Sequence, residues 1–365
     1  MDILLFIVVL VVLIVVHELG HFFVAKLCKM RVDEFGVGYP PRAYAIKKGE
    51  TEYSLNWLPF GGFVKIFGED LDARDEKESH RSFSARPRIQ QALVLVAGIA
   101  MNLIFAWVLL SSTLAVGVPR ALTPEQAQNA PDAVLTIAEV LPNSPATDAG
   151  LLPGDAIESV TVQGDVFTHY DAQAFTDLLA TEIDGVVLEV KGADGVTRTV
   201  EATPRTGVIA AAPSRVALGV SLVTVGTISV PWYQAPIDGF VLTWELTKQT
   251  AVGLAQFFAS IFTLSADLSQ VSGPIGIAGA VGNASDSGFA SLIALTAIIS
   301  INLALINILP FPALDGGRLL FVIIEAVTRR PIKPIVANTL NMVGFGLLIL
   351  LMLVITVSDV FKIVG

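Results

Sequence analysis

Four long apolar runs constrain this chain of 365 residues more than any other feature of its sequence. The hydrocarbon core of a bilayer is about 30 Å thick, and about 20 helical residues cross it. With 53% hydrophobic and only 15% charged residues, the chain is too apolar for an ordinary soluble protein. We therefore expect four transmembrane helices, from Ile3 to about Leu27, from about Ile89 to Val118, from about Phe289 to Leu309, and from about Leu340 to Ile363.

Basic residues predict the orientation of these helices, because Lys and Arg favour cytoplasmic loops. They gather between the first and second runs and again between the third and fourth. The two groups are Lys26, Lys29, Arg31, Arg42, Lys47, Lys48, Lys65, Arg74, Lys77, Arg81, Arg86 and Arg88, and Arg318, Arg329, Arg330 and Lys333. The amino terminus and the long acidic insert between the second and third runs would then face outward. The first run lacks a basic start and a cleavage site of small residues, so we expect a retained helix.

Composition also excludes some partners and cofactors. The formal net charge of −10 argues against nucleic acid, because phosphate binding needs clustered Lys and Arg. The single cysteine, Cys28, excludes an internal disulfide and a Cys-rich zinc site. Any metal must therefore be held by His, Asp or Glu.

The insert is predicted to contain a folded domain. From about Ala133 to Thr224, short apolar alternations are broken by Asp-Gly and Gly-Asp turns, with one helical stretch from about Asp171 to Thr181. The segment from Ser144 to Asp155 resembles the signature of bacterial PDZ domains, which bind extended peptides at a sheet edge. A small β-rich domain without a binding role is the alternative.

The first run carries the sequence His17-Glu18-Leu19-Gly20-His21. Positions i and i+4 lie on one face of a helix, so both imidazoles can point at one metal ion. Glu18 is placed beside them to act as general base on a water that the metal activates. Ionisable groups inside a membrane are costly and usually functional. The motif predicts a catalytic metal site rather than isolated histidines that bond neighbouring helices.

A catalytic zinc site normally has three protein ligands and one open position. His80 lies in a charged loop and His169 in the outward domain, so neither is a good third ligand. Asp315 directly follows the third run, in a segment with two prolines and two glycines where we expect irregular backbone that lines a polar cavity. We predict Asp315 as the third ligand; an Asp at a helix end on the membrane surface is the alternative.

Depth in the bilayer supports this pairing. His17 follows about fourteen apolar residues and so lies about 20 Å into the membrane, in its cytoplasmic half. The third run also crosses from outside to inside and delivers Asp315 to that side. The stretch from about Trp232 to Leu264 reads as an interfacial amphipathic helix or a fifth span. A fifth span would separate Asp315 from the histidines, so we place this stretch on the outer surface or in a re-entrant position.

Order, spacing and topology together resemble the site-2 protease family of intramembrane metalloproteases, in particular the bacterial regulator-of-sigma-E protease type with one PDZ domain. The resemblance covers nearly the whole chain. It implies zinc ligation by His17, His21 and Asp315, with Glu18 as catalytic base. It also suggests supporting roles for Asn302 and Asn307 in the third helix, each able to bond a substrate backbone or the developing oxyanion. Interhelical hydrogen bonds are their alternative role.

Further stretches share the family pattern. The segment from Phe35 to Pro40 resembles its Gly-x-Gly-aromatic-Pro loop, and Ser272 to Gly276 is also shared. The alternation from Thr51 to Phe67 predicts a β-hairpin or re-entrant loop. In the family this element is a strand edge that holds unwound substrate, which suggests substrate binding by Gly61, Gly62, Phe63 and Val64. The second run departs from the pattern, because Ile99 stands after Gly98 where the family usually has Pro; a role for Asn102 is therefore less defined.

These observations predict a mainly α-helical membrane protein with four transmembrane helices, a membrane-associated β-hairpin or re-entrant loop and an inserted α+β PDZ-like domain. The expected parts are 1–118, with helices one and two, the His17 motif and a β-loop at about 30–88; 119–230, the extracytoplasmic PDZ-like domain; 231–288, an interfacial linker; and 289–365, with helices three and four and Asp315.

The predicted function is zinc-dependent hydrolysis of peptide bonds in or next to transmembrane segments, as in regulated intramembrane proteolysis of an anti-sigma factor or a signal-peptide remnant. Expected partners are the lipid bilayer, membrane-protein substrates, and a peptide or substrate ectodomain at the PDZ-like domain. The expected location is the bacterial cell membrane, with the active site toward the cytoplasm. A transporter or metal channel is one alternative, although the fourth helix offers little polarity beyond Asn341. An inactive scaffold is another, although Glu18 is present.

Overall fold

A computed structural model describes residues 2–69, 80–127, 130, 132–168, 172–181, 185–192, 195–209, 214–263 and 273–364. The residues singled out above at Arg74, Lys77, His169, Asp171 and Ser272 lie outside these ranges. The chain divides into two compact units, Met1–Thr113 with Trp232–Gly365, and Leu114–Pro231. Each unit is described by itself.

Four helices of the first unit are long and apolar enough to cross a membrane, as the sequence predicted. They are α1 (Asp2–Leu27), α2 (Arg88–Val116), α8 (Phe289–Ile308) and α10 (Pro334–Val364). The fourth begins earlier than predicted, because Pro334 is compatible with a first helical turn and nothing breaks the helix before Leu340. Four apolar spans make the chain a multi-pass membrane protein.

Three further helices belong to this unit: α6 (Ala235–Phe262), α7 (Pro274–Asp286) and α9 (Asp315–Thr328). The sequence treated the residues between the third and fourth spans as a loop, and this was wrong, because α9 occupies fourteen of them. Two glycines in its first turn weaken the helical signal locally. Packing makes the helix possible, since Val322 on α9 is buried.

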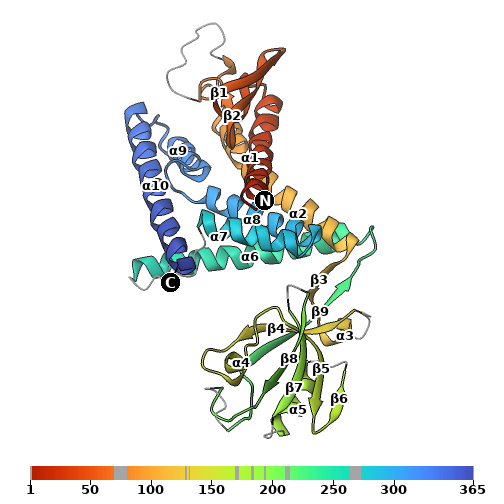
Figure 1. Cartoon of the computed structure of the whole chain (residues 1–365). Helices are drawn as coiled ribbons and strands as arrows, with labels where there is room; N and C mark the ends of the chain where they lie inside the picture. Colours follow the sequence, from red (N-terminus) through yellow and green to blue (C-terminus); the bar gives the residue numbers. More distant parts are fainter. Residues whose placement is uncertain are drawn as a thin grey trace. The chain divides into compact units, whose positions relative to one another are not determined.

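A two-stranded antiparallel hairpin, β1 (Val32–Lys48) and β2 (Thr51–Ile66), lies beside α1 (Figure 1). The segment from Phe35 to Pro40, expected as a loop, lies within β1, and the predicted hairpin over Thr51 to Phe67 is only its second strand. Gly49, at φ 65°, lies in the tight turn between the strands. The register is irregular between Val32 and Tyr44, because residues 34–37 of β1 pair with residues 62–65 and also with residues 52–55 of β2.

Small side chains hold the helices of the first unit together. Ala106 on α2 and Ala297 on α8 are fully buried in one cluster with Leu110 and Ile301. The hydroxyl of Ser300 on α8 donates to the backbone oxygen of Asn102 on α2, at 2.8 Å. Small residues allow close backbone approach, which is how helices associate in lipid.

The second unit is a mixed helix and sheet structure (Figure 1). Its elements are β3 (Val118–Ala121), α3 (Pro124–Ala127), β4 (Val134–Val140), α4 (Pro145–Asp148), β5 (Ala156–Val162), β6 (Asp165–Phe167), α5 (Ala172–Thr181), β7 (Val186–Lys191), β8 (Thr197–Ala202) and β9 (Val220–Ile228). The strand order is β3-β9-β4-β5-β7-β8, with β6 paired to β5. Phe175 on α5 is fully buried in a core with Leu188 and Leu218, so the helix covers one face of the sheet.

Candidate metal centre

The two histidines of α1 present their Nε2 atoms to the same point. These atoms lie 3.1 Å apart, and both side chains are buried. Their rings stand nearly edge to face, with centroids 4.8 Å apart. One helical turn separates them, so the local helix alone fixes this pairing.

Asp315 reaches both histidines from the first residue of α9. Its Oδ2 atom lies 2.8 Å from Nε2 of His17 and 3.3 Å from Nε2 of His21. Ligand atoms of all three residues lie within 4.8 Å of one another. A tetrahedral zinc ion with ligands at about 2.1 Å would hold its ligand atoms about 3.4 Å apart. Nitrogen and oxygen donors at these spacings fit zinc after small shifts.

The loop before α9 packs closely against the first turn of this helix, because two glycines there have no side chain. A Cβ at Gly317 would lie 2.7 Å from the carbonyl carbon of Phe311, and one at Gly316 would lie 2.5 Å from that of Ile308. Such approaches leave no space for a side chain. The first turn of α9 therefore packs directly on the preceding loop, and this places Asp315 beside α1.

Neighbouring groups on α2 orient the histidines. The Nδ1 atom of His21 lies 2.8 Å from the carbonyl oxygen of Val94, so it donates there and leaves Nε2 free as a ligand. Asn102 is fully buried, with its amide 3.3 Å from Nδ1 of His17. Its Oδ1 atom has no hydrogen-bond partner among the described residues. Rotating the amide by half a turn would let that oxygen accept from His17 Nδ1–H, the bond a zinc-binding His17 would make.

Gly98 allows α2 to approach the two imidazoles. A Cβ built on it would lie 2.8 Å from Cε1 of His17 and even closer to the ring of His21. A Cβ at Gly20 of α1 would likewise lie 2.9 Å from the Cα of Gly98. The two helices thus touch through glycine backbone at the level of the metal site.

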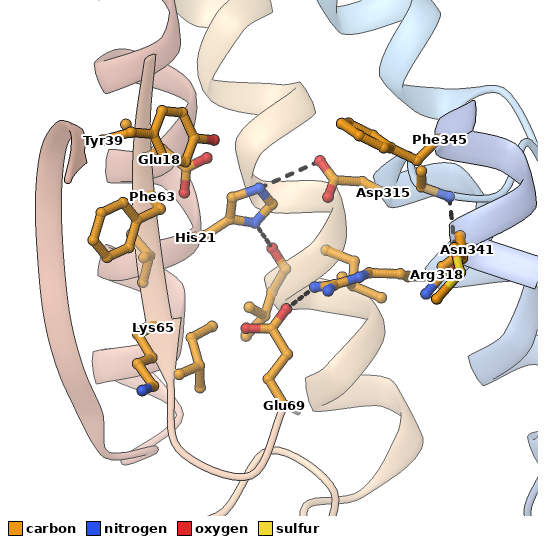
Figure 2. Close-up of a pocket in the computed structure, with 17 residues that line it drawn as sticks. Glu18, His21, Tyr39, Phe63, Lys65, Glu69, Asp315, Arg318, Asn341 and Phe345 are labelled. Atoms are coloured by element: carbon orange, nitrogen blue, oxygen red, sulfur yellow. Dashed lines mark hydrogen bonds and ion pairs between the residues drawn. The ribbon is translucent and has the colours of Figure 1, made fainter. Parts of the chain in front are cut away.

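A cavity of about 790 Å³ opens beside these groups. Glu18, His21 and Asp315 line it, together with Gly62, Phe63 and Val64 of β2. Asp315 approaches His21 from the side opposite Glu18 (Figure 2). Glu18, the expected base, and β2, the strand expected to hold substrate, therefore face the same cavity.

An ion pair links α9 to the end of the hairpin on this cavity. Arg318, one turn after Asp315, bonds to Glu69 (Figure 2). Both residues also line a second cavity of about 950 Å³. The pair thus lies where the two cavities meet.

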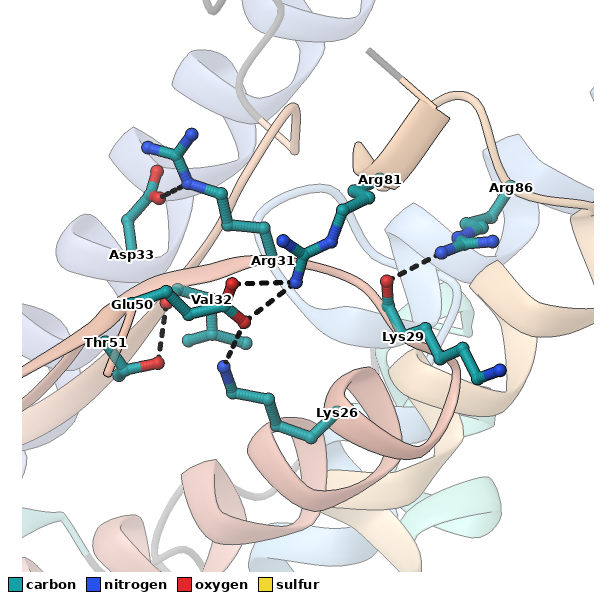
Figure 3. A network of polar contacts seen from close by, with 9 residues as sticks. All are labelled: Lys26, Lys29, Arg31, Val32, Asp33, Glu50, Thr51, Arg81 and Arg86. Atoms are coloured by element: carbon teal, nitrogen blue, oxygen red, sulfur yellow. Dashed lines mark hydrogen bonds and ion pairs between the residues drawn. The ribbon is translucent and has the colours of Figure 1, made fainter. Parts of the chain in front are cut away.

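A polar network fastens the turn of the hairpin to the end of α1 (Figure 3). Glu50 in the turn accepts from Lys26 at 2.7 Å and from Arg81 at 2.8 Å. The Thr51 hydroxyl donates to the backbone oxygen of Val32 at 2.8 Å. The hydrogen bond from Lys26, joined by those from Arg81, lowers the pKa of Glu50. The turn of the hairpin is therefore held against the end of α1, the helix that carries both histidines.

Three other residues predicted for the site are not among the described residues that line the cavity. Asn302 and Asn307 are on α8 and are not among the described residues that line the cavity. Their supporting role stays a prediction. Gly61 has a φ of 125° and would place a Cβ 3.1 Å from the Tyr39 ring. It directly precedes Gly62, which lines the cavity, and its part in substrate binding stays a prediction. His80 is exposed, as expected for a surface residue.

Sequence reasoning missed Val94 and gave Asn102 little weight. Val94 acts through its backbone oxygen, and because every residue has one, the sequence gives no sign of this contact. Asn102 had a usable signal, since an amide within an apolar span needs a partner. Gly98 and Asn102 lie four residues apart on one face of α2, which a helical projection of that span would reveal.

Similar proteins identify the family of this chain. The sequence model of peptidase family M50 matches residues 5–351. This chain belongs to peptidase family M50. It is 36% identical over 350 residues to a Clostridium perfringens protein named as a candidate zinc metalloprotease, covering 95% of each chain.

Two further relatives extend the match. A Nostoc protein, also named as a candidate zinc metalloprotease, is 32% identical and covers 96% of this chain and 93% of its own. The zinc metalloprotease RasP of Geobacillus kaustophilus is 28% identical and covers 98% of this chain and 97% of its own. This M50 member is accordingly a metalloprotease, a hydrolase with zinc as its cofactor, and both predictions are confirmed.

Proposed function

We propose that this M50 metalloprotease cleaves peptide bonds within or beside transmembrane segments of membrane proteins. One observation carries the proposal: His17 and His21 belong to a helix long and apolar enough to span a membrane, and their Nε2 atoms converge on Asp315. A protease whose metal ligands lie within a span must receive its substrate there. Substrates of this kind include anti-sigma factors and signal-peptide remnants.

His17, His21 and Asp315 would hold the zinc ion, and Glu18 would act as general base. Zinc bound there supplies Lewis acidity, which polarises a scissile carbonyl and acidifies a water. The Glu18 carboxylate takes the proton of the attacking water and returns it to the leaving amine. Its position on the cavity wall, one residue from His17, supports this role.

The β2 strand is proposed to hold the substrate in extended form. A transmembrane helix hides its peptide bonds in its own hydrogen bonds, so cleavage requires local unwinding. Gly62, Phe63 and Val64 pair with β1 on one side only, and the other edge of this segment can pair with an added strand. Gly62, Phe63 and Val64 line the cavity, which supports an extended substrate segment beside them.

The basic loops, the second unit and helix α6 suggest how the protein is arranged in the membrane. The basic loops support a metal site toward the cytoplasm and a unit Leu114–Pro231 outside the bacterial cell membrane. We assign this unit as PDZ-like, and expect it to bind a peptide or filter substrate ectodomains by size. Helix α6 exposes Ile237, Phe240 and Trp244 along one side, which suits an interfacial position.

The test is Glu18→Gln in the full chain, reconstituted with a model substrate that has one transmembrane helix. We expect bound zinc to stay at the wild-type amount, because Glu18 is not a ligand. Cleavage should fall by about 10²–10⁴-fold, as for loss of a general base. Glu245→Gln, on the exposed side of α6, is the matched control and should cleave normally. Undiminished cleavage by Glu18→Gln would eliminate the assigned base.

A further inference from the structure

A polar side chain of the fourth span contacts the loop that carries Asp315. The Oδ1 atom of Asn341 on α10 accepts a hydrogen bond from the backbone N–H of Ala313, at 3.3 Å (Figure 2). Asn341 lies within the candidate span Ile335–Phe361. An amide in such a span is costly without a partner, and the loop supplies one.

Ala313 needs this support because its backbone is strained. Its φ is 76°, in the left-handed region that residues with a Cβ rarely adopt. A side chain with a Cβ crowds the following carbonyl oxygen in this region, which glycine avoids. Ala313 precedes Asp315 by only two residues, so its conformation sets the direction from which the carboxylate reaches the histidines.

A second contact from the same face of α10 supports the loop. A Cβ at Gly344 would lie 2.6 Å from Cβ of Pro312 and 2.9 Å from its carbonyl carbon. Gly344 is three residues after Asn341, hence on the same side of the helix. The backbone of α10 at Gly344 therefore packs directly on Pro312, while Asn341 bonds the next residue.

We infer that Asn341 is a positioning residue for the metal site. By bonding Ala313 N–H it stabilises the left-handed turn and thereby holds Asp315 against His17 and His21. It lines the cavity but is not one of the three candidate metal ligands. The inference rests on the proposed zinc site, and it gives the fourth span a part in building that site.

The experiment measures zinc retention by the full chain in lipid nanodiscs against a competing chelator. Asn341→Ala should weaken zinc binding by about 10–100-fold, the usual effect of losing a group that orients a ligand. Ala313→Gly in the same chain should restore most of that loss, because glycine adopts positive φ without strain. Asn338→Ala, one turn earlier on α10, is the control and should retain zinc like wild type.

Rescue by Ala313→Gly separates positioning from general packing, since a role in helix packing would not respond to a change at residue 313. Asn341→Gln serves if Asn341→Ala does not fold, because it keeps the amide and moves its oxygen by one methylene. It should also weaken zinc binding. Wild-type zinc retention by the folded variant, or no rescue by Ala313→Gly, overturns the inference.

A His17→Ala arm in the same assay tests the underlying site separately. Complete zinc loss there, with normal retention by Asn341→Ala, would overturn only the role of Asn341. Zinc retained by His17→Ala would instead overturn the proposed ligand set.

Discussion

The Nε2 atom of His17 lies 2.8 Å from the Oδ2 atom of Asp315, although 298 positions separate the two residues in the chain. One residue belongs to the first span and the other begins a helix that follows the third. The intervening chain includes the whole second unit, Leu114–Pro231. The metal site therefore depends on how helices of the first unit pack, and changes at their contacts should alter it.

Gly98→Ala should weaken zinc binding at least about tenfold, because the new methyl would occupy the space of both imidazoles. Overpacking of this kind costs about 1–3 kcal/mol and would push His17 and His21 out of register with Asp315. Equilibrium dialysis against a zinc buffer measures the effect. Gly346→Ala is the control, since a methyl there meets no described atom within 4 Å. Equal zinc affinity in the two variants would contradict a tight α1–α2 contact at the site.

Asn102→Leu should lower zinc affinity by about 10–100-fold, because His17 would lose the buried partner of its Nδ1 atom. Asn102→Asp keeps an oxygen acceptor and should retain most of the affinity. Competition with a chromogenic chelator ranks the variants. If Asn102→Leu and wild type bind zinc equally, Asn102 does not orient His17.

Glu50 should make the hairpin sensitive to acid. Its pKa in the folded chain is lowered below the ordinary value of 4.5, so its ion pairs stabilise the fold above that pH. This stability is lost as the pH falls through the folded pKa, because the unfolded chain then binds more protons.

The measurement is the difference in thermal unfolding midpoint between wild type and Glu50→Gln in the same detergent. The difference should favour wild type at pH 7 and shrink below about pH 4.5. Glu201→Gln, on an exposed position of β8, is the control and should show no such trend. A gap that persists unchanged at low pH would mean that Glu50 acts through packing rather than charge.

Local sequence determined the features that need only neighbouring residues. The apolar runs predicted four spans, because length and hydrophobicity are enough to cross a bilayer. The spacing of His17 and His21 placed two imidazoles on one face, because a helix fixes that relation by itself. Topology deduced from basic loops then selected Asp315 as the residue that could join them.

Tertiary structure decided what lies between elements. Phe35 to Pro40 is strand rather than loop because β2 pairs with it, and α9 forms because its Val322 side chain is buried. Val94 contacts the site through its backbone carbonyl. Gly98 has no side chain where the imidazoles lie, and Asn341 bonds the strained turn at Ala313. The sequence shows a glycine and an amide within apolar spans, but which group each one meets depends on the distance between two separately folded segments. The sequence alone therefore determined the chemistry available to this protein, and helix packing decided which groups would share one cavity.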